Sequence, residues 1–201
     1  MKKLLLSVIT IIFVVLLNFS LLVFNTKFYE KEFYKLNVYE KFEKEKLNEN
    51  LNKLINFLRK NEKLETGFFN EKEKMQLEDV RILIRNALIM FYLFLILFII
   101  LIYLNKKNLE KPFLYSGIIL LILPLVFYLI NFSNFFLKFH ETLFSNNLWL
   151  LNPETDNLIN MFPENFFKDF VITVFIRSMF VGVLLILISL ILRKKLITPS
   201  S

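Results

Sequence analysis

The stretch FHETLFSNNLWLLNPETDNLINMFPENFFKDF, residues 139–170, is the one long segment that is neither plainly membrane-spanning nor plainly a charged helix. It contains the only histidine, His140, the only tryptophan, Trp149, and two prolines that begin turns, Pro153 and Pro163. Long apolar runs flank it on both sides. Phe and Trp favour the boundary between membrane and water, and imidazole titrates near neutral pH. The pattern indicates a polar loop between membrane-spanning segments, with its titratable group beside that boundary.

The composition indicates a membrane protein. The chain has 201 residues, of which 56% are hydrophobic, and it includes 25 phenylalanines. A soluble domain of this length has too small a core to bury so much apolar surface. The apolar residues also gather into long runs, which predict membrane-spanning helices.

The positions of the charges predict the orientation of the chain. The net charge of +7 comes from three short segments, residues 1–3, 105–112 and 193–201, and the remainder is neutral. A nucleic-acid-binding protein would gather basic residues on one soluble face, so this distribution does not favour nucleic acid. It is typical of the positive-inside rule. We therefore expect a plasma-membrane protein whose two termini both lie in the cytoplasm.

The composition also excludes several kinds of chemical site. The chain has no cysteine, which rules out a thiolate nucleophile and a zinc–thiolate site. A single histidine leaves a histidine-based metal cluster without ligands. The three glycines do not form a Gly-rich loop, so a P-loop or a dinucleotide fingerprint is absent. We expect neither a metal nor another cofactor.

Four apolar runs are long enough to cross a bilayer core of about 30 Å. The first is expected to be an uncleaved signal anchor, because the run from Leu4 to Phe24 is longer than a signal-peptide core and no small-residue cleavage site follows it. Four spans without paired broken helices do not favour a transporter. The expected fold is all-α, with spans at residues 1–24, 87–104, 113–130 and 171–192, a cytoplasmic turn at 105–112 and a cytoplasmic tail at 193–201.

Segment 25–86 is expected to form a small helical domain, the cap, outside the cytoplasm, and segment 131–170 is expected to be a loop on the same side. Segment 25–86 is rich in Lys and Glu, and from Tyr39 to Leu64 its apolar residues recur at helical spacing. This apolar face either packs inside the cap or lies on the outer leaflet as an interfacial helix. Residues 71–86 are predicted to form a helix that leads directly into the second span.

The 139–170 stretch also follows an order of residues found in a known family. In chain order it presents Phe139-His140-Glu141, Trp149, Pro153-Glu154-Thr155-Asp156, Leu158-Ile159, Pro163-Glu164 and Phe166-Phe167-Lys168-Asp169. This order resembles the signature of the Lit family, multi-pass membrane proteins whose characterised members are lipoprotein intramolecular transacylases. A weaker match at residues 68–80, FFNEKEKMQLEDV, has Gln76 where the family pattern has a histidine.

The resemblance implies both a reaction and a base. One ester-linked acyl chain of a diacylated lipoprotein would move from the glyceryl group to the nitrogen of its own amino-terminal cysteine, which gives a lyso-form lipoprotein. An α-amino group with a pKa of about 7.7–8.0 is largely protonated at neutral pH, so a base is needed. The resemblance implies that His140 is this general base, although a lone histidine at such a place is otherwise an ordinary hydrogen-bonded residue.

Gln76 departs from the family pattern and limits the mechanism. Glutamine can donate a hydrogen bond to an oxyanion or orient His140, but it cannot carry a proton at neutral pH. One hypothesis is that His140 acts as the base with Gln76 as a polar assistant. A second is that Glu78 or Asp79 takes the place of the missing histidine. A third is that the protein is a catalytically silent relative that binds a lipid or a partner protein.

Four other residues each have a structural and a functional interpretation. Arg177, two turns into the fourth span, either pairs with Asp169 or Asp156 or contacts polar atoms of a lipid. Asp156 suits the amino end of a helix, where acids are favoured. Phe139 and Trp149 either belong to an aromatic belt or line a slot for an acyl chain.

Overall fold

The computed structural model describes residues 2–60 and 62–197, and all regular secondary structure within these ranges is helical. Four helices are long and apolar enough to cross a membrane, which confirms the expected all-α fold with four spans. In chain order the elements are α1 (Lys2–Leu22), α2 (Thr26–Lys35), the 3-10 helix η1 (Val38–Glu40), α3 (Lys44–Arg59), α4 (Glu71–Leu104), α5 (Glu110–Tyr128), α6 (Phe132–Leu143), α7 (Asn157–Met161) and α8 (Glu164–Ile197).

The chain divides into two compact units, and α4 and α8 each contribute to both. We call one the membrane unit; it comprises Met1–Leu21, Ala87–Ile130 and Val171–Ser201. We call the other the polar unit; it comprises Leu22–Asn86 and Asn131–Phe170.

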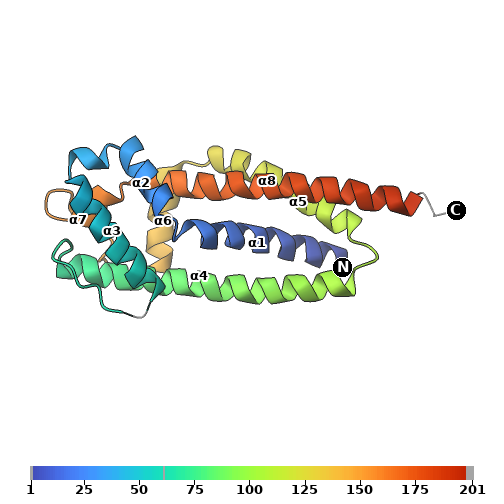
Figure 1. Ribbon diagram of the computed structural model, residues 1–201, viewed down its shortest axis with the longest axis horizontal. Helices are drawn as coiled ribbons and strands as arrows, with labels where there is room; N and C mark the ends of the chain where they lie inside the picture. Colours follow the sequence, from blue (N-terminus) through green and yellow to red (C-terminus); the bar gives the residue numbers. More distant parts are fainter. Residues whose placement is uncertain (1, 61, 198–201) are drawn as a thin grey trace. The chain divides into compact units, whose positions relative to one another are not determined.

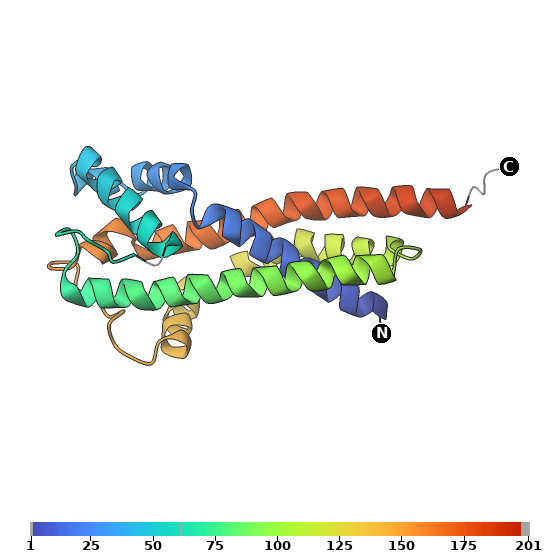
Figure 2. The ribbon, with the colours of Figure 1, turned by 60° about the horizontal axis from the view of Figure 1, so that its bottom comes forward.

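The membrane unit is built around a small apolar core to which α1, α5 and α8 contribute. Val14, Phe113, Leu120 and Leu185 are buried there, and Phe98 of α4 packs against them. Figures 1 and 2 show the four helices side by side. Helices suit this environment, since each satisfies its own backbone hydrogen bonds where no water is present.

One end of the membrane unit gathers positive charge. The start of α1, the turn between α4 and α5 and the end of α8 lie at this end (Figures 1 and 2). Ser189 Oγ of α8 donates a hydrogen bond of 2.6 Å to the carbonyl oxygen of Glu110, which joins α8 to the start of α5. The basic residues in these segments are Lys3, Lys106, Lys107, Lys111, Arg193 and Lys194. Such a gathering is what the positive-inside rule requires of a cytoplasmic end.

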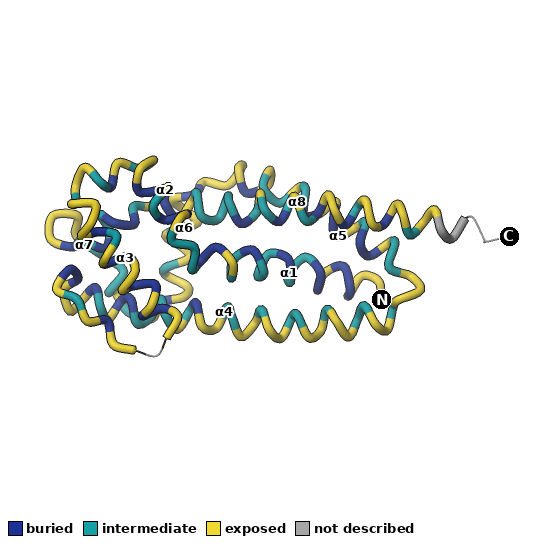
Figure 3. Tube along the Cα trace, viewed as in Figure 1, coloured by how far each residue is buried: buried dark blue, intermediate teal, exposed yellow. Residues whose placement is uncertain are grey.

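Helix α4 differs from the other spans in its burial. Its apolar window contains no buried residue, whereas 33% of the corresponding window of α1 is buried. Figure 3 shows this part of α4 as exposed and intermediate residues. Phe13 of α1 stacks on Phe98 of α4 with ring centroids 4.7 Å apart. The rest of this surface is apolar, which suits contact with lipid chains.

Helices α5 and α8 approach closely at two glycines. A Cβ atom added to Gly117 would lie 2.6 Å from the carbonyl oxygen of Gly182 and 2.5 Å from Cγ1 of Ile186. One added to Gly182 would lie 2.9 Å from Cβ of Leu120. Small residues at such crossings let helix backbones pack tightly inside a membrane.

The polar unit buries the apolar stripe of its Lys/Glu-rich segment. Leu47, Leu51, Leu54 and Leu58 of α3 are all buried. The stripe therefore packs within the unit, as the first of the two sequence interpretations supposed. Helix α2 adds Phe33, which is fully buried and lies 5.7 Å from the ring of Phe162.

The segment expected to be a loop, residues 131–170, contains three helical stretches. Asn131 caps α6, its Oδ1 accepting a hydrogen bond from Asn134 N. Helix α8 begins at Glu164, upstream of the predicted span at residue 171. Hydropathy marks only where a helix becomes apolar enough for a bilayer, whereas this helix starts earlier at the turn of Pro163.

We predict that Gly117→Ala lowers the thermal unfolding temperature of the protein in detergent micelles. The new methyl group would overlap a backbone oxygen of the neighbouring helix, and such overpacking costs about 1–3 kcal/mol. Gly67→Ala is the matched control, because an added Cβ there meets no atom within 4 Å. An unchanged unfolding temperature for Gly117→Ala would show that the close approach is not required.

Candidate functional site

His140 lies in the third turn of α6 and is held by its own helix. Its Nδ1 atom is 2.7 Å from the carbonyl oxygen of Phe136. A carbonyl oxygen only accepts hydrogen bonds, so Nδ1 carries the proton and donates. In the neutral ring Nε2 then has a free lone pair. The side chain is therefore prepared to accept a proton at Nε2.

Aromatic rings surround the imidazole of His140. Phe136 meets it edge-on at 4.3 Å between centroids, Phe144 stacks on it at 5.5 Å, and Trp149 lies 5.1 Å away. Burial among these rings lowers the pKa of His140 below its ordinary value of 6.5, and the hydrogen bond to Phe136 opposes this effect. The imidazole is consequently neutral at neutral pH.

Gln76 is buried on α4, with only 4% of its surface exposed. Within the described part of the chain its Oε1 atom is buried without a hydrogen-bond partner. A buried amide oxygen that lacks a donor costs free energy, so such an atom in a native structure calls for an explanation.

A cavity of about 100 Å³ lies between α4 and the segment that follows α6. Asp79 contributes a carboxylate to it and accepts a hydrogen bond of 2.8 Å from Asn146 Nδ2. Phe144, which stacks on His140, also lines the cavity. Gln76 and Asp79 are three residues apart on α4 and so share a helix face. The lining residues are Asp79, Ile82, Leu83, Leu143, Phe144, Ser145 and Asn146.

Glu78 has a different environment from Asp79. It forms an ion pair with Arg81 one turn further along α4, and 45% of its side chain is exposed. Arg81 in turn lies over the ring of Phe57, at 4.4 Å from the centroid. Of the two carboxylates suggested by the sequence, only Asp79 lines the cavity.

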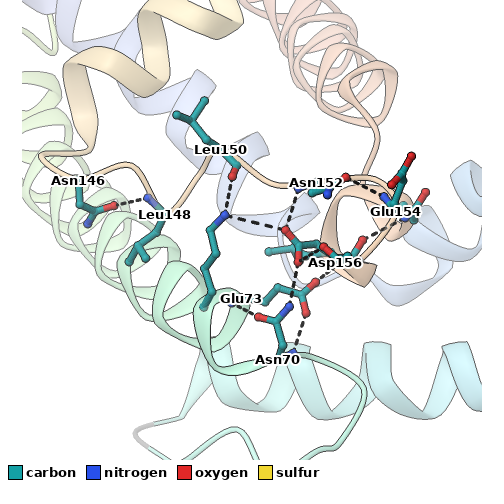
Figure 4. A network of polar contacts seen from close by, with 12 residues as sticks. Asn70, Glu73, Asn146, Leu148, Leu150, Asn152, Glu154 and Asp156 are labelled. Carbon is teal, nitrogen blue, oxygen red and sulfur yellow. Dashed lines mark hydrogen bonds and ion pairs between the residues drawn. The ribbon is translucent and has the colours of Figure 1, made fainter.

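Asp156 belongs to a polar network at the start of α4 (Figure 4). Its carboxylate accepts hydrogen bonds from Asn152 N at 2.8 Å and from Asn70 Nδ2 at 2.9 Å. These bonds lower the pKa of Asp156 below its ordinary value, the backbone bond from Asn152 contributing most. Lys72 extends the network by donating to the carbonyl oxygen of Leu150 at 2.6 Å. Asp156 therefore has a structural role in the polar unit.

Asn70 and Glu73 form a capping box at the start of α4. Glu73 Oε2 accepts from Asn70 N at 2.7 Å, and Asn70 Oδ1 accepts from Glu73 N at 3.0 Å. The other oxygen of Glu73, which is almost fully buried, accepts from Leu158 N of α7. The capping box thus joins the segment around residue 70 to the segment around residue 157. The sequence interpretation missed both residues, although Asn-x-x-Glu before a helix is a recognised capping signal.

The remaining residues singled out from the sequence lie beside His140, in α8 and in an ion pair of the polar unit. Trp149 packs directly on His140, and Phe139 lies 5.5 Å from the same ring with 40% of its surface exposed. Arg177 is in α8 within the membrane unit, where it is partly buried. Asp169, expected as one of its partners, is bound by Lys35 Nζ at 2.7 Å within the polar unit.

The described part of the chain also has a second groove, but it has no cluster that meets the requirements of a metal site. In the described ranges no group of three or more His, Asp or Glu side chains is arranged to hold a metal ion. A wider surface groove of about 470 Å³ lies between the end of α3 and residues 62–65 of the polar unit, and none of the predicted site residues lines it.

Comparisons with known proteins agree with the resemblance found in the sequence. The family model for the lipoprotein intramolecular transacylase Lit matches residues 4–167. A solved in meso structure of the membrane-integral lipoprotein intramolecular transacylase Lit from Bacillus cereus is 26% identical, with a TM-score of 0.85 over 96% of this chain and 95% of that chain. Two variants of that protein, with a histidine replaced by arginine or by alanine, match over 91% and 93% of their chains with TM-scores of 0.83. A comparison with curated proteins gave no match.

We predict that Glu73→Leu destabilises the polar unit. The substitution leaves Asn70 N and Leu158 N without their acceptor; Leu158 is buried, and a buried unpaired group costs about 1–3 kcal/mol. Thermal unfolding followed by the fluorescence of Trp149 should show a lower midpoint. Glu71→Gln is the control, because 87% of that side chain is exposed and its substitution should cost at most about 0.5 kcal/mol. Equal midpoints for the two variants would contradict a structural role for Glu73.

Proposed function

Because the chain belongs to the lipoprotein intramolecular transacylase (Lit) family, we propose that it is itself an intramolecular acyltransferase that acts on diacylated lipoproteins. In this reaction the amino-terminal cysteine nitrogen attacks the carbonyl carbon of an ester-linked chain on the glyceryl group of the same molecule. The nitrogen–carbon bond forms and the ester carbon–oxygen bond breaks. The amine loses a proton, and the departing glyceryl oxygen gains one to become a hydroxyl group.

One observation carries this proposal: the hydrogen bond between His140 Nδ1 and the carbonyl oxygen of Phe136. It directs the free lone pair to Nε2, while burial keeps the ring neutral at neutral pH. His140 Nε2 accepts the amine proton as the nitrogen attacks and then delivers it to the glyceryl oxygen. The nucleophile and the ester are parts of one molecule, so few further catalytic groups are required.

Gln76 acts as a polar assistant in the proposed reaction. Its amide N–H groups can donate to the oxyanion that develops when the amine attacks the ester carbonyl. Glutamine does not exchange protons at neutral pH, so His140 carries out both proton transfers. Phe139 and Trp149 provide apolar surface beside His140 for the acyl chain.

The proposed orientation follows from the basic end of the membrane unit. The protein is membrane-integral, with four apolar helices. We place the end formed by Lys3, the α4–α5 turn and the last turns of α8 in the cytoplasm of a plasma membrane. Diacylated lipoproteins carry their lipid in the bilayer and their polypeptide on the outer side. The orientation therefore presents residues 22–86 and 131–170 on the side where such a substrate is found.

We predict that His140→Asn lowers the rate of acyl transfer by about 10²-fold or more, since a positioned general base contributes about 10²–10⁴-fold. The asparagine amide can still donate to the carbonyl oxygen of Phe136, so the fold should persist. Purified protein would be assayed with a synthetic diacylated lipopeptide by mass spectrometry. The neighbouring variant Glu141→Gln is the control, because Glu141 is exposed.

The pH profile provides a second readout of the same prediction. As the pH falls, protonation of His140 removes the base and lowers kcat. Because burial lowers the pKa of His140, kcat should fall only below pH 6.5. Full activity of His140→Asn, or a loss of kcat already well above pH 6.5 with a substrate that saturates the enzyme, would remove His140 from the mechanism.

The second candidate function is a catalytically silent family member that binds a lipid or a partner protein. The observation that favours it is the glutamine at position 76, where the family pattern has a histidine. Under the acyltransferase proposal we predict that the wild-type chain forms lyso-form lipoprotein in a host that lacks its own transacylase. The Gln76→His variant should then match or exceed it, as scored by mass spectrometry of a reporter lipoprotein. If neither protein converts the reporter while the Bacillus cereus relative does, the silent function is favoured.

A further inference from the structure

The cavity beside Asp79 is suited to a small cationic group. Among the described residues that line it, Asp79 is the only charged one. Its Oδ2 atom accepts from Asn146 Nδ2, and Ser145 adds a hydroxyl group to the lining. The hydrophobic residues Ile82, Leu83, Leu143 and Phe144 complete the wall. The Asp79 carboxylate thus faces a hollow that is open to solvent and lined by both polar and apolar atoms, where it can attract a cation at short range.

The size of the cavity limits what can occupy it. At about 100 Å³ it has room for an amino group and the carbon atoms next to it, since one water takes about 30 Å³ of liquid. A fatty acyl chain is much larger. A single carboxylate is a poor site for a divalent metal ion, which takes several charged or carbonyl ligands. A primary ammonium group fits both the charge and the volume.

The unpaired oxygen of Gln76 points to the same chemistry. Gln76 lies one turn before Asp79 on the same face of α4, and its Oε1 atom is buried without a partner in the described residues. Such an atom needs a hydrogen-bond donor, and an ammonium group has three N–H donors. Gln76 itself is not among the residues that line the cavity, so the Asp79 carboxylate is the acceptor that the cavity provides.

We propose that the Asp79 cavity is the subsite for the α-ammonium group of the lipoprotein's amino-terminal residue. This inference rests on the proposed function, because that function supplies the ligand. Asp79 is a binding residue in it and not the base, since a carboxylate is a much weaker base than the neutral imidazole of His140. The proton therefore passes to His140, whose ring stacks on Phe144, a residue of the cavity lining.

The subsite also gives the reaction a means of releasing its product. The substrate amine is cationic at neutral pH, whereas the N-acylated product carries a neutral amide at the same nitrogen. On the way the ammonium group loses two protons: His140 takes the first and releases it to water before the attack, and then takes the second and delivers it to the glyceryl oxygen. Acyl transfer thus abolishes the charge that Asp79 binds. An N-acylated lipoprotein should consequently compete poorly with a lipoprotein whose amine is free.

The test is a binding measurement with ligands that cannot react. Two diacyl lipopeptides with ether-linked chains would be compared in phosphatidylcholine nanodiscs, one with a free α-amine and one N-acetylated. The wild-type protein should bind the free amine about 10- to 100-fold more tightly, the range expected for a hydrogen bond to a charged group. Asp79→Asn, which can still accept from Asn146, should lose this preference and retain its affinity for the N-acetylated peptide. Glu78→Gln, at the adjacent exposed position, should keep the preference.

The outcomes separate this inference from the proposed function. Equal binding of the two peptides by the wild-type protein, or an unchanged preference in Asp79→Asn, overturns the subsite even if acyl transfer occurs. An amine preference that depends on Asp79 supports the subsite even if no transfer is detected. Addition of phosphatidylethanolamine to the nanodiscs tests the other source of a primary ammonium group. If that lipid abolishes the preference, the cavity binds a lipid headgroup and the assignment to the lipoprotein amine is wrong.

Discussion

Two buried carboxylates hold the polar unit together. Glu73 and Asp156 accept hydrogen bonds from the backbone and side chains of two segments that are some eighty residues apart in the chain. These segments, around Asn70 and around Asn157, fall in the two stretches, 68–80 and 139–170, on which the sequence resemblance rests. Leaving any of these donors unpaired would cost more than the bonds themselves contribute. In this chain, Glu73 and Asp156 of these stretches therefore serve the fold of the polar unit.

His140, the proposed base, does not take part in this network. His140 obtains its tautomer from a carbonyl of its own helix and its neutrality from the rings around it. Neither property requires a second charged residue. The proposed base role of His140 therefore does not depend on position 76, which is glutamine here and a histidine in the pattern that the sequence resembles.

The sequence predicted the features that depend on composition over long windows. The four spans follow from apolar runs, and the helix ending at Arg59 follows from its 3.6-residue stripe. The sequence did not predict features that depend on individual contacts. Hydrophobic periodicity cannot show that Asp169 pairs with Lys35 or that Asn146 forms a hydrogen bond with Asp79. The short capped helix α6 was missed because its apolar residues were assigned to a loop at the membrane boundary. The Asn-x-x-Glu capping signal that begins at Asn70 is visible in the sequence, but it was interpreted only as part of the family resemblance.

Helix α4 shows how far a membrane can take the place of protein contacts. Its apolar window has no buried residue, so acyl chains complete the packing that neighbouring side chains provide elsewhere. Lipid tails adapt to any hydrocarbon shape, so exchanges among Leu, Ile and Phe on this surface should cost little as long as hydropathy is retained. At Gly117, by contrast, a single added methyl group would overlap the neighbouring helix.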